Sequence, residues 1–169
     1  MNQTLLLGYG NADRQDDGVA WHILVAIAKK LGFKPPEEPG EPFNTQQYNL
    51  DLMFVLQLFP ELAEDLRTYD HVVFIDAHTG EIEKEISALK IDPLYQHSPF
   101  THHLSPQTLL SITQTIYNKY PQGIILSVRG YEFGFERQLS RRTLDLCNQA
   151  VNQLWNWLQD DTYVFAHDD

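Results

Sequence analysis

Short apolar runs alternate with segments of helical periodicity along this chain of 169 residues. Runs of β-branched and aromatic residues predict buried strands, and a polar–apolar alternation predicts a partly exposed strand. The predicted strands cover residues 4–7, 43–48, 70–76, 82–91 and 123–128. The run from Val72 to Ile75 is the clearest, because it is apolar without interruption, and residues 43–48 give the weakest signal.

Apolar positions three and four residues apart predict helices between these strands. The predicted helices cover residues 19–30, about 50–67 with a break at Pro60, 105–117 and 140–159. Ser105 and Ser140 each precede a helical pattern, as N-capping residues do, and Pro106 suits the first position of its helix.

Strands that alternate with helices predict a single-domain three-layer α/β/α sandwich with a mostly parallel, mixed central sheet of about five strands. The placement of residues 82–91, close after the preceding strand, predicts at least one antiparallel member. We expect residues 1–159 to form the domain and residues 160–169 to form a flexible C-terminal tail.

The chain is acidic, with 12 Lys and Arg against 23 Asp and Glu and a formal net charge of -11. Such a chain repels phosphate backbones, so nucleic acid is a poor partner, whereas a basic protein surface or a cation suits it. The single cysteine, Cys147, excludes an intrachain disulfide and a thiolate metal cage.

The first residues predict neither a signal sequence nor a membrane-spanning segment, so we expect no contact with a membrane. Residues 1–8 have no basic segment and only three consecutive leucines, too few for a signal sequence or a membrane span. We therefore expect a cytoplasmic protein. The glycine loop after the first strand, with Gly8 and Gly10, lacks the third glycine of a dinucleotide-binding motif, so no nucleotide cofactor is expected.

Candidate chemistry gathers where predicted strands end. In sheets of this type, functional groups lie in the loops beyond the carboxyl ends of the strands. Asp16 and Asp17 follow the first strand, Asp76 ends the strand over residues 70–76, and His102 and His103 precede the helix that begins near residue 105. Two carboxylates and one neutral imidazole suit a divalent ion such as zinc or nickel.

Each of these residues also has a structural explanation. We expect Asp16 to cap the first helix, and Asp17 could complement the dipole of the same helix. Asp76 could begin an Asx-turn, although a carboxylate that ends so apolar a strand needs hydrogen-bond donors or a cation. The two loop histidines could be solvated, and His78 is close enough in sequence to support Asp76.

Taken in order, these motifs resemble those of the hydrogenase maturation endopeptidases, a family of nickel-dependent processing proteases. The resemblance rests on the Gly-Asn loop with its acidic pair, on a strand that ends in Asp-Ala, on a histidine loop and on a late loop before the last helix. These motifs lie at residues 5–20, 73–77, 101–106 and 132–140. One motif alone is weak, but four in the right order are specific.

The resemblance implies an endopeptidase that removes the C-terminal extension of a NiFe hydrogenase large-subunit precursor after nickel insertion. It implies that Asp17, Asp76 and His102 contact the metal and form the catalytic site, with His103 as the alternative to His102. The nickel would be carried by the substrate, with zinc and cadmium as candidate substitutes. Residues 1–159 would be the protease domain, although residues 45–50 differ from the segment that relatives carry after their second strand.

Two alternatives to a protease remain. A receiver-like phosphoacceptor module also has an acidic pair after its first strand and an Asp at the end of a central strand. It needs a lysine after the last core strand, where this chain has Arg129 and Gly130. A non-catalytic metal-binding module on the same scaffold would use the same three residues as the protease.

Overall fold

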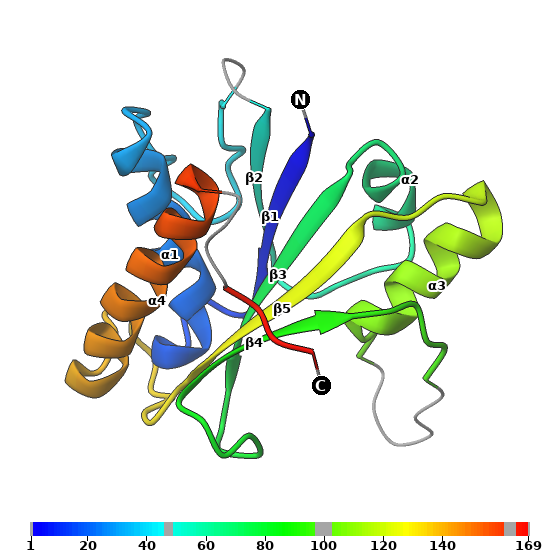
Figure 1. Ribbon diagram of the computed structural model, residues 1–169. Coiled ribbons are helices and arrows are strands. Elements are labelled where there is room, and N and C mark those ends of the chain that lie inside the picture. The colour runs from blue at the N-terminus through cyan, green and yellow to red at the C-terminus, as the bar shows by residue number, and fades with distance from the viewer. Residues whose placement is uncertain (1, 46–48, 97–102, 161–164, 169) are drawn as a thin grey trace.

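The computed structural model describes residues 2–45, 49–96, 103–160 and 165–168 (Figure 1). One five-stranded sheet has the strand order β2-β1-β3-β5-β4, in which only β4 runs antiparallel to its neighbour. The strands are β1 (Thr4–Tyr9), β2 (Leu50–Val55), β3 (His71–His78), β4 (Ile86–Ile91) and β5 (Gln122–Arg129). The helices are the 3-10 turn η1 (Gln15–Gly18), α1 (Val19–Lys30), α2 (Leu62–Leu66), α3 (Pro106–Tyr117) and α4 (Arg141–Gln159). The predicted α/β/α sandwich with a mixed, mostly parallel sheet is confirmed.

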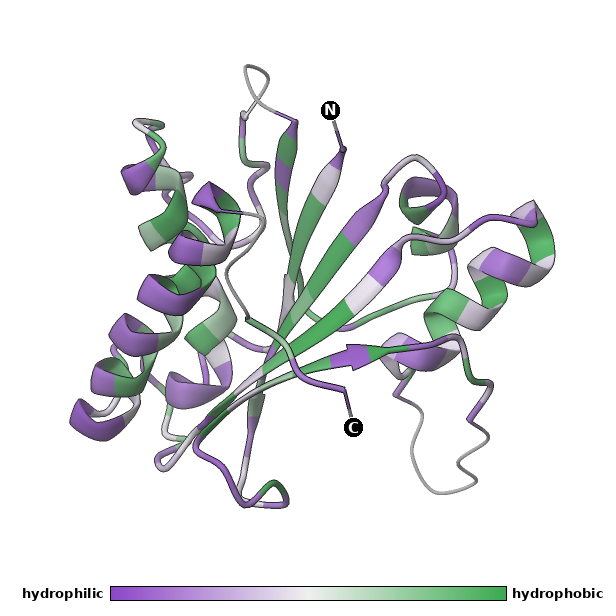
Figure 2. Cartoon of the chain, viewed as in Figure 1, coloured by the Kyte–Doolittle hydropathy of each residue, from purple (hydrophilic) through white to green (hydrophobic). Residues whose placement is uncertain are grey.

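The central strands bury both of their faces. Alternate residues of β1 and β3 point to opposite faces of the sheet, so each strand supplies two cores. Leu6 and Val73 pack with α1 and α4, whereas Leu7 and Phe74 pack with α2 and α3. Figure 2 shows this as green central strands, with purple polar residues on the outer faces of the helices. Burial on both faces explains the uninterrupted apolar run of β3 in the sequence.

The predicted helix over residues 50–67 is wrong in its first part. Residues 50–55 form β2, an edge strand parallel to β1, and only Leu62–Leu66 is helical. Leu50 and Leu52 are buried and Asp51 is half-buried, which is the two-residue period of a strand with one face on the core. A short apolar run fits both a strand and a buried helix, and the partner β1 decides between them.

The other elements lie close to their predicted positions. Ser105 caps α3 and Ser140 caps α4, each by accepting a hydrogen bond from a backbone N–H of the first turn. The alternating strand is shorter than predicted and begins at Ile86. Residues 43–45 are not in a strand, and residues 46–48 of the same predicted strand lie outside the described residues. Within the described parts of the chain, no helix is long and apolar enough to cross a membrane.

Of the expected flexible tail over residues 160–169, residues 161–164 and 169 lie outside the described residues, and residues 165–167 pack on the rest of the domain. Phe165 and Ala166 are buried against the core of α1 and α4. The N–H of His167 donates to the Ala88 carbonyl, and the N–H of Lys90 donates to the His167 carbonyl, so this segment extends the sheet beside β4. Burial of the Phe165 ring holds this segment on the core, although the residues around it are mostly polar.

Removing the Phe165 ring tests this contact. Phe165 is 6% exposed, so Phe165→Ala should lower the free energy of unfolding by about 3 kcal/mol through lost burial and a cavity. Phe135 is 97% exposed, and Phe135→Ala should leave the free energy of unfolding unchanged. Urea denaturation of both variants measures the difference. Equal stabilities would show that residues 165–167 do not pack on the sheet.

Candidate functional site

The buried carboxylate of Asp16 joins the connection after β1 to the connection between β5 and α4. Asp16 is fully buried in η1, and its side chain accepts hydrogen bonds of 2.7 to 2.9 Å from the connection between β5 and α4 and from the first turn of α4. The donors are the N–H groups of Tyr131, Glu132 and Ser140 and the hydroxyls of Ser140 and Thr143. Burial alone would raise the pKa of Asp16, but these hydrogen bonds outweigh it and hold the pKa below its ordinary value.

From the sequence we expected Asp16 to cap the first helix. This expectation is wrong. Gly18 occupies the N-cap position of α1, and no side chain caps that helix. Asp16 instead lies at the N-terminus of α4, where a negative charge meets the positive end of the helix dipole. Its donors are 115 or more residues away in sequence, so no local pattern could reveal them.

Asp17, the first predicted metal contact, is half-buried beside the loop that leaves β1. Its Oδ2 accepts the N–H of Asn11 at 2.8 Å. Gly10 has a φ of 136°, and a Cβ atom at this position would lie 2.2 Å from the Asp17 carbonyl oxygen. The glycine is therefore required for the close approach of this loop to Asp17.

Asp76, the second predicted contact, lies near the end of β3 on the face that α2 and α3 share. Its Oδ2 accepts the Tyr9 hydroxyl and its Oδ1 accepts the Ser127 hydroxyl, both at 2.8 Å. Burial raises the pKa of Asp76 to about 6, against the lowering effect of these two hydrogen bonds. Burial and the nearby Asp76 raise the pKa of Tyr9 as well, so its hydroxyl remains a donor at neutral pH.

The structure brings Asp17 and Asp76 to the same end of the sheet, because β1 and β3 are adjacent and parallel. His102 lies outside the described residues, so its predicted role stays a prediction. His103 is exposed in the connection before α3. Among the residues that the structure describes, no three His, Cys, Asp or Glu side chains are grouped closely enough to hold a metal ion.

Sequence reasoning missed the two hydroxyls that hold Asp76. Ser127 is the direct cross-strand neighbour of Asp76 in the β3–β5 pairing, and Tyr9 ends the strand on the other side. Recognising either contact requires the strand order. His78 is 2% exposed, not solvated. Its Nδ1 accepts the N–H of Gly80 at 3.2 Å, and its Nε2 has no hydrogen-bond partner in the described part of the chain.

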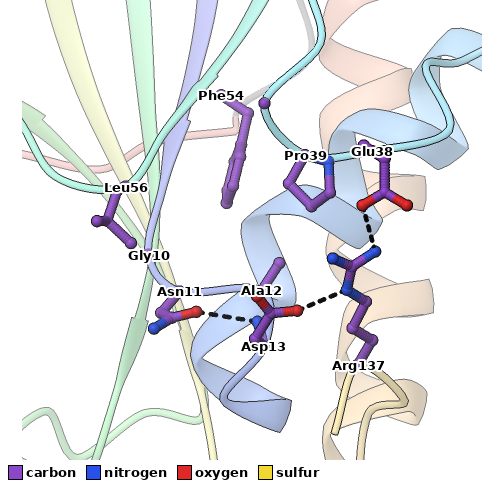
Figure 3. A pocket seen from close by; sticks show the side chains of 10 residues that line it. Gly10, Asn11, Ala12, Asp13, Glu38, Pro39, Phe54, Leu56 and Arg137 are labelled. Atoms are coloured by element: carbon purple, nitrogen blue, oxygen red, sulfur yellow. Dashed lines mark hydrogen bonds and ion pairs between the residues drawn. The ribbon is translucent and has the colours of Figure 1, made fainter.

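A pocket of about 270 Å³ lies between the loop after β1, the end of β2 and residues 38–40 (Figure 3). Its lining includes Asn11, whose N–H donates to Asp17. Phe54, Leu56 and Pro39 form its apolar wall. Arg137 stands at its rim, where its Nε donates to Asp13 at 2.6 Å and its Nη1 donates to Glu38 at 2.7 Å. Three connections far apart in the sequence therefore meet at this pocket.

Asp16→Asn tests the buried carboxylate. An asparagine keeps one acceptor oxygen but places an NH₂ group among donors, so we expect the free energy of unfolding to fall by about 2–4 kcal/mol. Asp13→Asn, in the same loop, removes only an exposed ion pair and should cost less than about 1 kcal/mol. Thermal and urea denaturation measure both, and similar small losses would contradict the role of Asp16.

Asp76→Asn should have the opposite effect on stability. A pKa raised to about 6 means that the folded state binds the proton more tightly than the unfolded state. The stability contribution of protonated Asp76 is thus present below the ordinary pKa of about 3.9 and is lost as pH rises through about 6. The neutral amide of the variant avoids this loss, so the variant should gain about 1–3 kcal/mol at pH 7 and none at pH 3. Urea denaturation across this pH range measures the gain, and a loss at pH 7 would contradict it.

No protein-family model and no curated protein matches the chain at the level of sequence. Solved structures do match it. The hydrogenase maturating endopeptidase HybD from E. coli superposes with a TM-score of 0.67 at 17% identity, over 95% of this chain and 94% of that chain. The [NiFe] hydrogenase maturation protease HycI from Thermococcus kodakarensis KOD1 gives 0.63 at 16% identity, over 94% of each chain.

The hydrogenase 2 maturation peptidase from Thaumarchaeota archaeon SCGC_AB-539-E09 gives a TM-score of 0.61 at 18% identity, over 93% of this chain and 98% of that chain. The agreement covers nearly the full length of each of these proteins, although fewer than one residue in five is identical. This chain therefore has the fold of the hydrogenase maturation endopeptidases.

Proposed function

We propose that this chain is an endopeptidase that removes the C-terminal extension of a NiFe hydrogenase large-subunit precursor after nickel insertion. The full-length likeness in fold to proteins named as such proteases supports the proposal. The observation that carries it furthest is geometric: the hydroxyls of Tyr9 and Ser127 hold the Asp76 carboxylate near the carboxyl end of β3, at the same end of the sheet as Asp17. Burial there also raises the pKa of Asp76. A carboxylate that costs stability where it stands is expected at functional sites.

In this proposal the nickel belongs to the substrate, and Asp17, Asp76 and His102 contact it. Tyr9 and Ser127 each donate one hydrogen bond to Asp76, one to each oxygen. A carboxylate oxygen has two lone pairs, so both oxygens keep acceptor capacity for a cation. The two hydroxyls fix the plane of the carboxylate, as outer hydrogen bonds do around metal ligands.

A cation also suits the electrostatics of this position. Burial disfavours the ionised form of Asp76 and so raises its pKa, and a positive charge within a few ångströms restores the ionised form. Oxygen and imidazole donors accept nickel and, in its place, zinc or cadmium. A precursor that carries no metal lacks this anchor, so its scissile bond is not held in position for cleavage. We assign metal contact to the three residues and name no general base.

The test incubates the protein with nickel-loaded and nickel-free large-subunit precursor and follows the mass of the precursor. We expect loss of a C-terminal peptide from the nickel-loaded form only. Asp17→Ala, Asp76→Ala and His102→Ala should each slow processing by about 100-fold or more, because each loosens the anchored substrate. Asp145→Ala, at an exposed position on α4, is the control and should process at the unaltered rate.

Two outcomes would contradict the proposal. Full processing by both Asp76→Ala and His102→Ala would remove the metal contact from the mechanism. Binding of the nickel-loaded precursor without any cleavage would instead favour the non-catalytic metal-binding module on the same scaffold.

A further inference from the structure

Two adjoining pockets form one groove along the outer edge of β2. The first is the pocket of about 270 Å³ at the loop after β1, and the second, of about 390 Å³, runs along β2 to Asp51. Both linings include Gly40 and Phe54, so the two pockets adjoin. We propose that this edge groove binds an extended polypeptide segment of the substrate that carries apolar and basic side chains. The identity of that substrate rests on the proposed function.

The place of the edge groove favours a polypeptide over a small molecule. Its volumes do not separate the two, because the first part lies just below and the second part within the roughly 300–1,000 Å³ of sites that enclose a small ligand. Both parts lie along the edge of β2, where a peptide can follow the strand. The groove ends at Asn11, whose N–H is held by Asp17. A segment that lies in the groove therefore leads directly to a residue that the proposed mechanism uses.

The backbone of β2 offers hydrogen-bonding groups to such a segment. The carbonyls of Asn49 and Val55 accept from β1 and the loop that follows it, so the odd-numbered residues direct their backbone groups to β1. The even-numbered residues Leu52 and Phe54 direct theirs to the outer edge. In the described part of the chain, no backbone hydrogen bond joins these two residues to the facing segment 40–43. An unpaired edge strand is a template for an added peptide strand.

The opposite edge of the sheet differs. There the backbone of His167 pairs with Ala88 and Lys90 of β4. Figure 1 shows the C-terminal segment crossing in front of that side of the sheet, while β2 lies at the other side. The edge at β2 is thus the one that the described chain leaves open for a partner.

An apolar side chain of the substrate has a matching wall. Leu56 directs its side chain to the pocket in Figure 3 and is 66% exposed, and Phe54 forms the neighbouring surface. Covering such a leucine stabilises a complex by about 1–2 kcal/mol.

The charges along the edge groove favour a basic partner. The charged residues that line its two parts are the acids Asp13, Glu38, Glu41 and Asp51 and the single base Arg137. Arg137 is already engaged by two of these acids, so the lining keeps an excess of negative charge. A lysine or arginine next to the apolar side chain of the substrate complements this lining and speeds association at low salt.

Leu56→Ser tests the apolar wall, with Ile116→Ser on α3 as the matched control. The two side chains are 66% and 62% exposed, so neither change should unfold the protein, and neither changes the net charge. With nickel-loaded precursor as substrate, Leu56→Ser should raise KM by about tenfold and leave kcat within about twofold, because it removes binding that substrate and transition state share. Ile116→Ser should leave both constants unchanged.

Glu41→Lys tests the charge, with Glu64→Lys on α2 as the control. Both glutamates are exposed, and both substitutions change the net charge by the same amount. Glu41→Lys should raise KM at low salt and weaken the salt dependence of KM, whereas Glu64→Lys should do neither. If the two variants behave alike, the charge of the groove does not select the substrate.

A measurement without catalysis separates this inference from the proposed function. A synthetic C-terminal peptide of the precursor, free of nickel, is titrated into ¹⁵N-labelled protein, and the amide shifts of Leu52 and Phe54 should move. If precursor is processed but neither variant nor these amides respond, the groove is overturned and the protease stands. If the amides respond but no precursor is cleaved, the protease is overturned and the groove stands.

Discussion

The site depends on the buried carboxylate of Asp16. Its hydrogen bonds join the turn after β1 to the start of α4, two segments that are more than 110 residues apart in sequence. This contact fixes η1, and η1 in turn places Asp17 against the loop at Gly10 and Asn11. A buried charge with this many donors is held in place, because moving it would leave the N–H groups of Tyr131, Glu132 and Ser140 without this acceptor. The hydrogen bonds that stabilise η1 are therefore the same ones that fix the position of Asp17, the first candidate metal contact.

Asp76 is the counterpart, a carboxylate that the fold supports incompletely. Among the described residues it accepts from two hydroxyls where Asp16 accepts five hydrogen bonds, and its pKa is raised where that of Asp16 is lowered. Asp16 follows β1, and Asp76 lies near the end of the neighbouring parallel strand β3. The two carboxylates differ in the balance between burial and hydrogen bonding. That difference separates a structural acid, Asp16, from the acid for which we propose a metal contact, Asp76. It also explains why the function proposed for Asp76 does not extend to Asp16.

The sequence could predict what depends on local pattern. The apolar run of β3, the two serine caps and the proline at the start of α3 each depend on a few neighbouring residues, and the type of sheet followed from the order of the elements. Residues 50–55 could not be assigned, because an apolar run is a strand only when a partner such as β1 pairs with it. The hydroxyls of Tyr9 and Ser127 and the donors to Asp16 come from distant segments, so they depend on a strand order that no local pattern contains. The edge groove has the same origin, since three separate connections form it.

The central claim is that this protein contacts the nickel of its substrate through its own oxygen and nitrogen donors. Nickel-edge X-ray absorption tests it directly, on nickel-loaded precursor frozen alone and frozen after rapid mixing with the protein. We expect the complex to gain oxygen or nitrogen neighbours at about 2.0–2.2 Å from the nickel, the distance range of carboxylate and imidazole ligands to a comparable divalent ion. This gain should be reduced in the complex with Asp76→Ala. A nickel environment that is the same with and without the protein would contradict the claim.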